Sequence, residues 1–223
     1  MRPYDAVTFD CYGTLVDWER GIAEAFAAAA SRAGRTLTPA GVLCAYAEIE
    51  PEVESGAYRP YRQVLAATAA RVAARLGWPL DEKDAGFLAE SLPAWPPFAD
   101  TSAALSRLCR AGIRLGILSN VDDDLLDATR RHLAVSFDLV VTAQQVRSYK
   151  PGHAHFETAR AALGPSARWL HAAQSTFHDV VPAKALGIPV AWINRKGESA
   201  GAAVAPDREF RNLTQLADWL TGA

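Results

Sequence analysis

The sequence FDCYGTL occupies residues 9–15 and directly follows the run AVT at residues 6–8. A short run of β-branched and aromatic residues predicts a strand, and Gly13 marks a turn just beyond it. The pattern therefore predicts a strand over residues 6–9 that stops at Asp10. In a parallel sheet this places Asp10 at the carboxyl end of a strand, where such sheets bind their ligands.

The next part of the chain, from residue 18 to about residue 95, has the pattern of successive helices. Apolar residues recur there at helical spacing, and glycines stand where two of the helices end. The predicted helices cover residues 21–33, 64–76 and 84–92, and prolines at positions 93, 96 and 97 close the block. We expect residues 17–96 to form a helical cap domain inserted after the first strand.

Strands and helices alternate in the remainder of the chain. Predicted strands cover residues 113–118, 137–142, 169–173 and 189–193, and predicted helices cover residues 101–111, 153–163, 179–186 and 212–220, with another helix opening at residues 122–124. This alternation predicts an α/β fold with a doubly wound parallel sheet and helices on both faces. We expect residues 1–16 and 97–223 to form this core domain.

Four polar segments come to one edge of the predicted sheet. The carboxyl ends of parallel strands meet there, which brings Asp10, Ser119, Lys150 and Asp179 together. A carboxylate acts as a covalent nucleophile when it is ionised and poorly solvated, and this requires a fixed cation such as Lys150. Asp179 then either holds Lys150 or orients a water molecule. The pattern favours catalysis by Asp10.

Hydroxyl groups beside these charges have two candidate roles. Those of Ser119 and Thr14, together with the turn amides of residues 11–13, either orient the aspartate or bind a substrate anion. Simpler readings exist for single residues: a turn at Ser119-Asn120, a helix cap at Asp179 and a surface lysine at position 150. The four segments together favour the catalytic interpretation.

Two other features resemble reactive sites only superficially. Cys11 has no histidine near it in the sequence to activate its thiol, so we expect a buried structural cysteine. His153 and His155 are spaced like a pair of metal ligands, but nothing else in the sequence supports such a site.

The four polar segments resemble, in the same order, the four motifs of the haloacid dehalogenase superfamily. FDCYGTL is similar to the first motif, Leu118-Ser119-Asn120 to the second, Tyr149-Lys150-Pro151 to the third and residues 174–179 to the fourth. The resemblance extends over nearly the whole chain. It implies a Rossmann-like core with a helical cap, and a hydrolase that uses Asp10 as its nucleophile.

Two departures bear on the chemistry within that superfamily. Its phosphatases carry carboxylates at the positions that Tyr12 and Gln174 occupy here, and Mg²⁺ prefers such hard oxygen ligands. The Tyr12 pattern instead resembles the L-2-haloacid dehalogenases, which need no metal. The resemblance therefore implies that this protein needs neither a metal ion nor another cofactor. In those enzymes the aspartate displaces halide from C2 of a 2-haloacid with inversion. Water then hydrolyses the ester to a 2-hydroxy acid.

The resemblance, together with the residues themselves, gives a set of expected substrate-binding residues. They are Cys11, Tyr12, Asn120, Ser175, Arg59 and Arg62. Asn120 matches a residue that the dehalogenases use near the halide, and Ser175 aligns with their fourth motif. The cap arginine of those enzymes has no counterpart near residues 46–48, so we expect Arg59 or Arg62 to supply the cation.

Composition limits the partners. The formal net charge is −2 and the pI is about 6.2, which gives no electrostatic case for binding nucleic acid or an anionic membrane. Three separated cysteines, no signal-peptide pattern and no apolar run long enough to span a bilayer lead us to expect a cytoplasmic protein. Its expected partner is a small anionic substrate, and a homodimer is left open.

Two alternative functions stay open at this point. One is a phosphatase acting on a small phosphorylated metabolite. The other is a fold relative that binds a partner through its cap. Release of chloride, Mg²⁺-dependent release of phosphate, or neither, distinguishes the three hypotheses.

Overall fold

The chain divides into two compact units in a computed structural model, which describes residues 3–199 and 205–222. The sheet unit comprises the chain up to Val16, Pro97–Asn120 and the chain from Arg131 onward. The helical unit comprises Asp17–Pro96 together with Val121–Arg130. The last of these segments was expected in the core, and it belongs instead with the helices.

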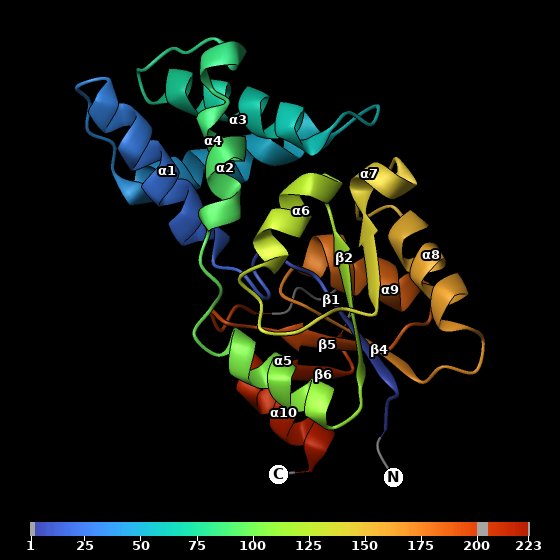
Figure 1. Ribbon diagram of the computed structural model, residues 1–223. Coiled ribbons are helices and arrows are strands. Elements are labelled where there is room, and N and C mark those ends of the chain that lie inside the picture. The colour runs from blue at the N-terminus through green and yellow to red at the C-terminus, as the bar shows by residue number, and fades with distance from the viewer. Residues whose placement is uncertain (1–2, 200–204, 223) are drawn as a thin grey trace. The chain divides into compact units, whose positions relative to one another are not determined.

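Within the described residues, the sheet unit is built on a six-stranded sheet in the order β3-β2-β1-β4-β5-β6, with every neighbouring pair parallel (Figure 1). This confirms the predicted α/β fold. The strands are β1 Ala6–Phe9, β2 Arg114–Ser119, β3 Leu139–Thr142, β4 Trp169–Ala173, β5 Val190–Ile193 and β6 Arg208–Phe210. The strand order reverses beside β1, and such a switch point is where open sheets bind ligands.

Helices flank this sheet. They are α5 Thr101–Arg110, α7 Ala143–Val146, α8 Ala154–Leu163, the π-helical turn η3 Thr176–Val180, α9 Val181–Ala185 and α10 Leu213–Thr221. Helices α5 and α10 lie side by side (Figure 1), and an ion pair joins Arg107 of α5 to Asp218 of α10. A buried apolar cluster includes Phe156 of α8, Ala183 of α9 and Trp192 of β5. Burial of such side chains, worth about 1.5–3 kcal/mol each, holds the layers together.

Strand β6 is the one strand of the described sheet that the sequence pattern did not predict. It has three residues, Arg208–Phe210, and none of them is buried. Its backbone pairs with β5, and Phe210 O accepts a hydrogen bond from Asn194 N at 2.8 Å. A strand held by backbone pairing at a sheet edge shows neither an apolar run nor clear alternation.

The helical unit comprises α1 Trp18–Arg32, α2 Pro39–Glu54, α3 Tyr61–Arg75, η1 Glu82–Asp84, α4 Phe87–Ser91, η2 Leu92–Ala94 and α6 Asp123–Arg130. Helix α2 was missed, although Thr38 caps it by accepting from Gly41 N at 3.2 Å and Pro39 opens its first turn. The helix predicted over residues 84–92 is instead broken into short turns. Across the residues described here, no helix is long and apolar enough to cross a membrane.

Asp122 explains why residues 121–130 join the helical unit. Helix α3 begins after Pro60, which has no side-chain acceptor to offer as a cap. The buried Asp122 carboxylate takes that role, accepting from Tyr61 N at 2.8 Å and from Arg62 N at 2.9 Å. The guanidinium of Arg62 also bonds Asp124, at 2.5 Å. A carboxylate at a helix N-terminus also complements the helix dipole.

A close helix contact in this unit gives a first prediction. A Cβ added to Gly21 of α1 would lie 2.2 Å from Cγ of the buried Trp95. Gly21→Ala should therefore lower the free energy of unfolding by about 1–3 kcal/mol, the usual range for overpacking. Denaturant titration measures this. The control is Gly86→Ala, because the nearest atom to its added Cβ is a Glu90 side-chain oxygen at 3.8 Å. Equal stability of the two variants would contradict the prediction.

Candidate active site

Asp10 stands where β1 ends, and its backbone is fixed on both sides. Its N–H donates to Ala172 O of β4 at 3.1 Å, which continues the sheet pairing by one residue. The chain then turns back, with Leu15 N donating to Cys11 O at 2.8 Å. Gly13 takes a φ of 100° in this turn, a left-handed conformation that favours glycine. The FDCYGTL stretch therefore fixes the backbone of Asp10 at the end of β1.

Thr14 ties this turn to the loop after β4. Its hydroxyl donates to Asp10 Oδ2 at 2.8 Å and accepts from Gln174 N at 2.9 Å. Thr14 is fully buried, so these bonds are not exposed to competing water. The expected orienting role of Thr14 toward Asp10 agrees with this geometry.

Lys150 is the centre of the site. Its Nζ donates to Asp10 Oδ1 at 3.0 Å, to Asp179 Oδ1 at 2.6 Å and to Leu118 O at 2.9 Å. An ammonium group has three N–H bonds, so these three acceptors use all of its donors. The side chain is 1% exposed. A buried charge is tolerated only when it is paired and hydrogen-bonded in this way.

Asn120 holds the backbone of Lys150. Its Oδ1 accepts from Lys150 N at 2.7 Å, and its Nδ2 donates to Lys150 O at 2.9 Å. The loop after β2 therefore fixes the lysine that neutralises the aspartate after β1. The structure gives Asn120 this positioning role, and its expected contact with substrate stays a prediction.

Asp179 is buried in η3, the turn that follows β4. Ser175 caps this turn, because its hydroxyl accepts from His178 N at 3.0 Å. Oδ1 of Asp179 takes bonds from Lys150 and also lies 3.0 Å from Nε2 of His171. Oδ2 is buried and has no hydrogen-bond partner among the residues that the structure describes. Asp179 thus holds Lys150, and one of its oxygens stays available.

The electrostatics follow from burial. Burial raises the pKa of the Asp10 carboxyl, and Lys150 opposes that rise. Burial also favours the acid form of Asp179, but Lys150 and then His171 outweigh it and hold its pKa below the usual range. For Lys150 burial lowers the pKa, and the two carboxylates overcome this and raise it. The lysine therefore stays charged. The ionised form of Asp10 is stabilised less than that of Asp179.

Two buried histidines belong to this cluster and were not predicted as members. His155 of α8 lies with Nε2 3.2 Å from Ser119 O, and His171 occupies the middle of β4. Burial, then the charge of Lys150, lowers the pKa of His155 to about 3, so its ring is neutral. A histidine inside an otherwise apolar strand, WLHAA, was the available signal for His171. The hydroxyl of Ser119 is buried with no partner in the described part of the chain.

Four other residues predicted to bind substrate differ in burial and in their hydrogen-bond partners. Cys11 is fully buried, and burial followed by the charge of Asp10 raises the pKa of its thiol well above the usual range, which agrees with a structural cysteine. Tyr12 is half-buried and bridges to Val16. In the helical unit Arg59 donates to Val53 O at 2.7 Å, while Arg62 engages Asp122 and Asp124. The substrate-binding role of both arginines stays a prediction.

The two carboxylates of the site are directed at an ammonium group. Asp10 and Asp179 both direct an oxygen at the Lys150 ammonium, and Tyr12 and Gln174 supply no carboxylate. Within residues 3–199 and 205–222, no group of three or more His, Cys, Asp or Glu residues is placed to hold a metal ion.

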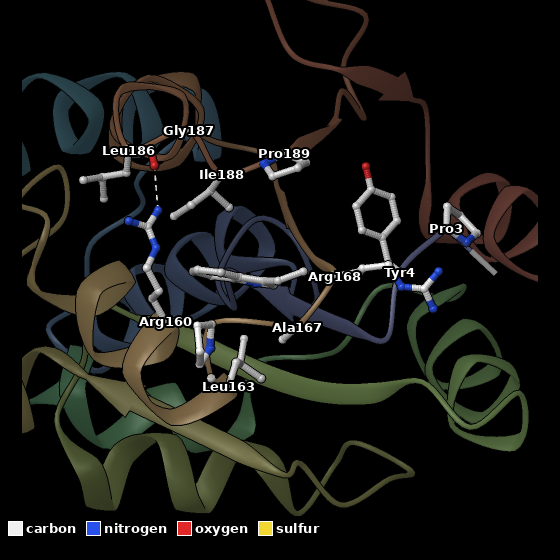
Figure 2. A pocket seen from close by; sticks show the side chains of 13 residues that line it. Pro3, Tyr4, Arg160, Leu163, Ala167, Arg168, Leu186, Gly187, Ile188 and Pro189 are labelled. Atoms are coloured by element: carbon white, nitrogen blue, oxygen red, sulfur yellow. Dashed lines mark hydrogen bonds between the residues drawn. The ribbon is translucent and has the colours of Figure 1, made fainter. Parts of the chain in front are cut away.

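A hollow of about 650 Å³ lies at the amino ends of the strands, opposite the ends that carry Asp10 (Figure 2). Its walls include Tyr4 before β1, Trp169 at the start of β4 and Pro189 before β5, so it opens at the amino ends of the strands. Arg160, which also lines it, donates to Leu186 O at 2.6 Å. This hollow is separate from the cluster around Asp10.

Comparison with known proteins identifies the family. The chain matches the model of the haloacid dehalogenase-like hydrolases over residues 4–173, and it belongs to this family of hydrolases. It is 28% identical to (S)-2-haloacid dehalogenase H-109 of Pseudomonas putida, over 99% of each chain. It is 29% identical to the (S)-2-haloacid dehalogenase of Pseudomonas sp. strain YL, over 96% of this chain and 88% of that one.

A solved structure agrees with these relatives. The L-2-haloacid dehalogenase RSc1362 superposes with a TM-score of 0.81 at 25% identity, over 99% of each chain. The similarity therefore includes the fold of the whole chain as well as the motifs.

The pKa of His155 gives a second prediction. Between about pH 3 and 6.5, the ordinary pKa of histidine, the His155 ring is protonated in the unfolded chain and neutral in the native protein. The stabilisation is therefore complete above that window and is lost as the pH falls through it. His155→Gln should make the free energy of unfolding less steeply dependent on pH there, by up to about 1 kcal/mol per pH unit.

Denaturant titrations at several pH values measure this slope. His153→Gln is the matched control, because that histidine is exposed two residues earlier. A His155→Gln slope equal to that of the parent would contradict the prediction.

Proposed function

We propose that this hydrolase removes halide from a small 2-haloacid and releases the 2-hydroxy acid, through an ester on Asp10. The observation that carries the proposal is the buried Lys150 ammonium, which pairs with Asp10 and Asp179 at once. The similarity to enzymes named (S)-2-haloacid dehalogenases supports the choice of substrate class. The helical segment 17–96 would serve as the cap over the site, in a cytoplasmic enzyme.

The first step is a displacement at carbon. An oxygen of Asp10 forms a bond to C2 of the substrate, and the carbon–halogen bond breaks with its electron pair leaving on the halide. Within the described part of the chain, Asp10 Oδ1 accepts one hydrogen bond from Lys150 and Oδ2 accepts one from Thr14. Each oxygen therefore keeps a lone pair for the attack. Burial removes water from this carboxylate and raises its pKa, while the Lys150 ammonium opposes that rise and favours the ionised form.

The second step is hydrolysis of the ester. Water adds to the carbonyl carbon of the Asp10 ester, and the bond between that carbon and the substrate oxygen breaks. One proton of the water stays on the departing oxygen to give the 2-hydroxy acid, the other is released to solvent, and the Asp10 carboxylate re-forms. Asp179 Oδ2, buried and without a protein partner in the described chain, is the group we assign to orient this water. Its lowered pKa makes it a weak base, so orientation is its main contribution.

The substrate carboxylate needs donors of its own. The Ser119 hydroxyl is buried and has no partner among the described residues, which makes it suitable for this role. Tyr12, Asn120 and Ser175 in the sheet unit, and Arg59 or Arg62 in the helical unit, complete the proposed binding set. A dry site would strengthen these contacts with a small anion.

A third prediction tests the nucleophile. Asp10→Asn should lower the rate of chloride release from (S)-2-chloropropionate by about 10⁴-fold or more, the scale of loss when a nucleophile is deleted. An amide is a very poor nucleophile of nearly the same shape, so the variant should keep its fold, although its free energy of unfolding should fall because Lys150 loses one of its two carboxylates. Asp5→Asn is the control, because Asp5 is exposed at the other end of β1 and pairs with Arg168. Substantial turnover by Asp10→Asn would contradict covalent catalysis.

A fourth prediction concerns metals. Chloride release should be unaffected by a chelator and by added Mg²⁺, because the Lys150 ammonium already occupies the place between Asp10 and Asp179. Activity measured after dialysis against EDTA checks this. Loss of activity on chelation, restored by Mg²⁺ together with hydrolysis of p-nitrophenyl phosphate, would favour the phosphatase hypothesis instead.

A further inference from the structure

His171 lies directly behind the charge cluster and is not among the predicted catalytic residues. It stands in the middle of β4, where all five residues are buried, and its own side chain is fully buried. The ring packs edge-on against Phe156, with centroids 5.2 Å apart. A polar ring at such a position is tolerated only if its nitrogens are satisfied.

Both ring nitrogens have partners. Nε2 lies 3.0 Å from Asp179 Oδ1, and Nδ1 lies 2.9 Å from the hydroxyl oxygen of Thr8 on the neighbouring strand β1. Thr8 in turn accepts from the indole N–H of Trp169 at 2.7 Å. These residues form a continuous row of hydrogen bonds that ends at Asp179.

The direction of the bonds follows from which groups are able to donate. An ionised carboxylate only accepts, so Nε2 of His171 must carry a proton and donate to Asp179. The indole of Trp169 only donates, so the Thr8 hydroxyl oxygen accepts from it, and the same hydroxyl also bonds Nδ1 of His171. The row of hydrogen bonds therefore fixes the His171 ring with Nε2 directed at Asp179.

The consequence for Asp179 is geometric. The terminal torsion of an aspartate is broad and roughly two-fold, so a single bond to Lys150 leaves the carboxylate free to rock. Lys150 and His171 both donate to the same oxygen, Oδ1, from two elements of the sheet unit. Two donors on one oxygen fix the plane of the group and direct Oδ2 away from them.

We propose that His171 is a positioning residue for the proposed dehalogenation: it selects the Asp179 oxygen that holds Lys150 and leaves the other oxygen for the hydrolytic water. This inference rests on the proposed function for its role in turnover. Its structural part, the orientation of Asp179, stands on the hydrogen bonds alone. Lowering of the Asp179 pKa by His171 agrees with a donated hydrogen bond.

The test uses paired substitutions at His171. His171→Leu removes the donor, whereas His171→Gln keeps an N–H close to the position of Nε2. Phe156→Leu is the matched control, because Phe156 contacts the same ring without a hydrogen bond and its truncation disturbs packing alone. The readouts are kcat and KM for chloride release, thermal stability, and the orientation of Asp179 in crystal structures of the variants.

His171→Leu should lower kcat by about 10- to 100-fold, the range known for outer partners of catalytic groups, with KM little changed. His171→Gln should recover most of that loss, and Phe156→Leu should lose stability with kcat near the parent. The crystal structures should show the Asp179 carboxylate rotated in the leucine variant and retained in the glutamine variant. If His171→Leu does not fold, Thr8→Val, which removes the hydroxyl that bonds Nδ1, should lower kcat in the same direction to a smaller extent.

The inference is overturned if His171→Leu matches Phe156→Leu in kcat, or if His171→Gln recovers nothing. A parent enzyme that releases no chloride overturns the proposed function instead. The crystal structures then decide the positioning role alone, and an unmoved Asp179 in the leucine variant counts against it.

Discussion

One buried ammonium group organises the candidate site. Lys150 donates to two carboxylates and one backbone carbonyl, which lie at the carboxyl ends of three strands. Asp10 follows β1, Leu118 is near the end of β2, and Asp179 is in the turn after β4. Removing a single partner from such a cluster leaves a buried charge uncompensated, which typically destabilises a protein by about 3–5 kcal/mol. The strand order, the Thr14 bond and the Asn120 clamp are therefore all constrained by the need to bring these groups within 3 Å of one nitrogen.

The same interaction sets different tasks for two similar carboxylates. Asp179 is fully buried and receives bonds from Lys150 and His171, so its ionised form is strongly stabilised. Asp10 also pairs with Lys150, but burial has the larger effect and raises the pKa of its carboxyl. Paired carboxylates whose environments push their pKa values apart commonly have separate roles in catalysis. Here the contrast agrees with a nucleophile at position 10 and a fixed support at position 179.

Much of this was predictable because strand ends in a parallel sheet converge. That rule predicts from the sequence that Asp10, Lys150 and Asp179 meet, and the FDCYGTL motif indicates the first of them. The supporting contacts were not predictable, since the bond from His171 to Asp179 and the Asp122 cap of α3 depend on side-chain directions across distant segments. Strand β6 was not predicted because backbone pairing at the edge of a sheet requires no apolar pattern.

The central claim is that Asp10 carries the substrate as an ester. The most direct test is a single turnover of (S)-2-chloropropionate in ¹⁸O-water with enzyme in excess, followed by mass spectrometry of the peptide that contains Asp10. Hydrolysis at the ester carbonyl predicts one ¹⁸O atom in the Asp10 carboxylate and an unlabelled hydroxyl in the product. Label in the product hydroxyl, with an unlabelled Asp10 peptide, would mean that water attacks the substrate directly and would contradict the account.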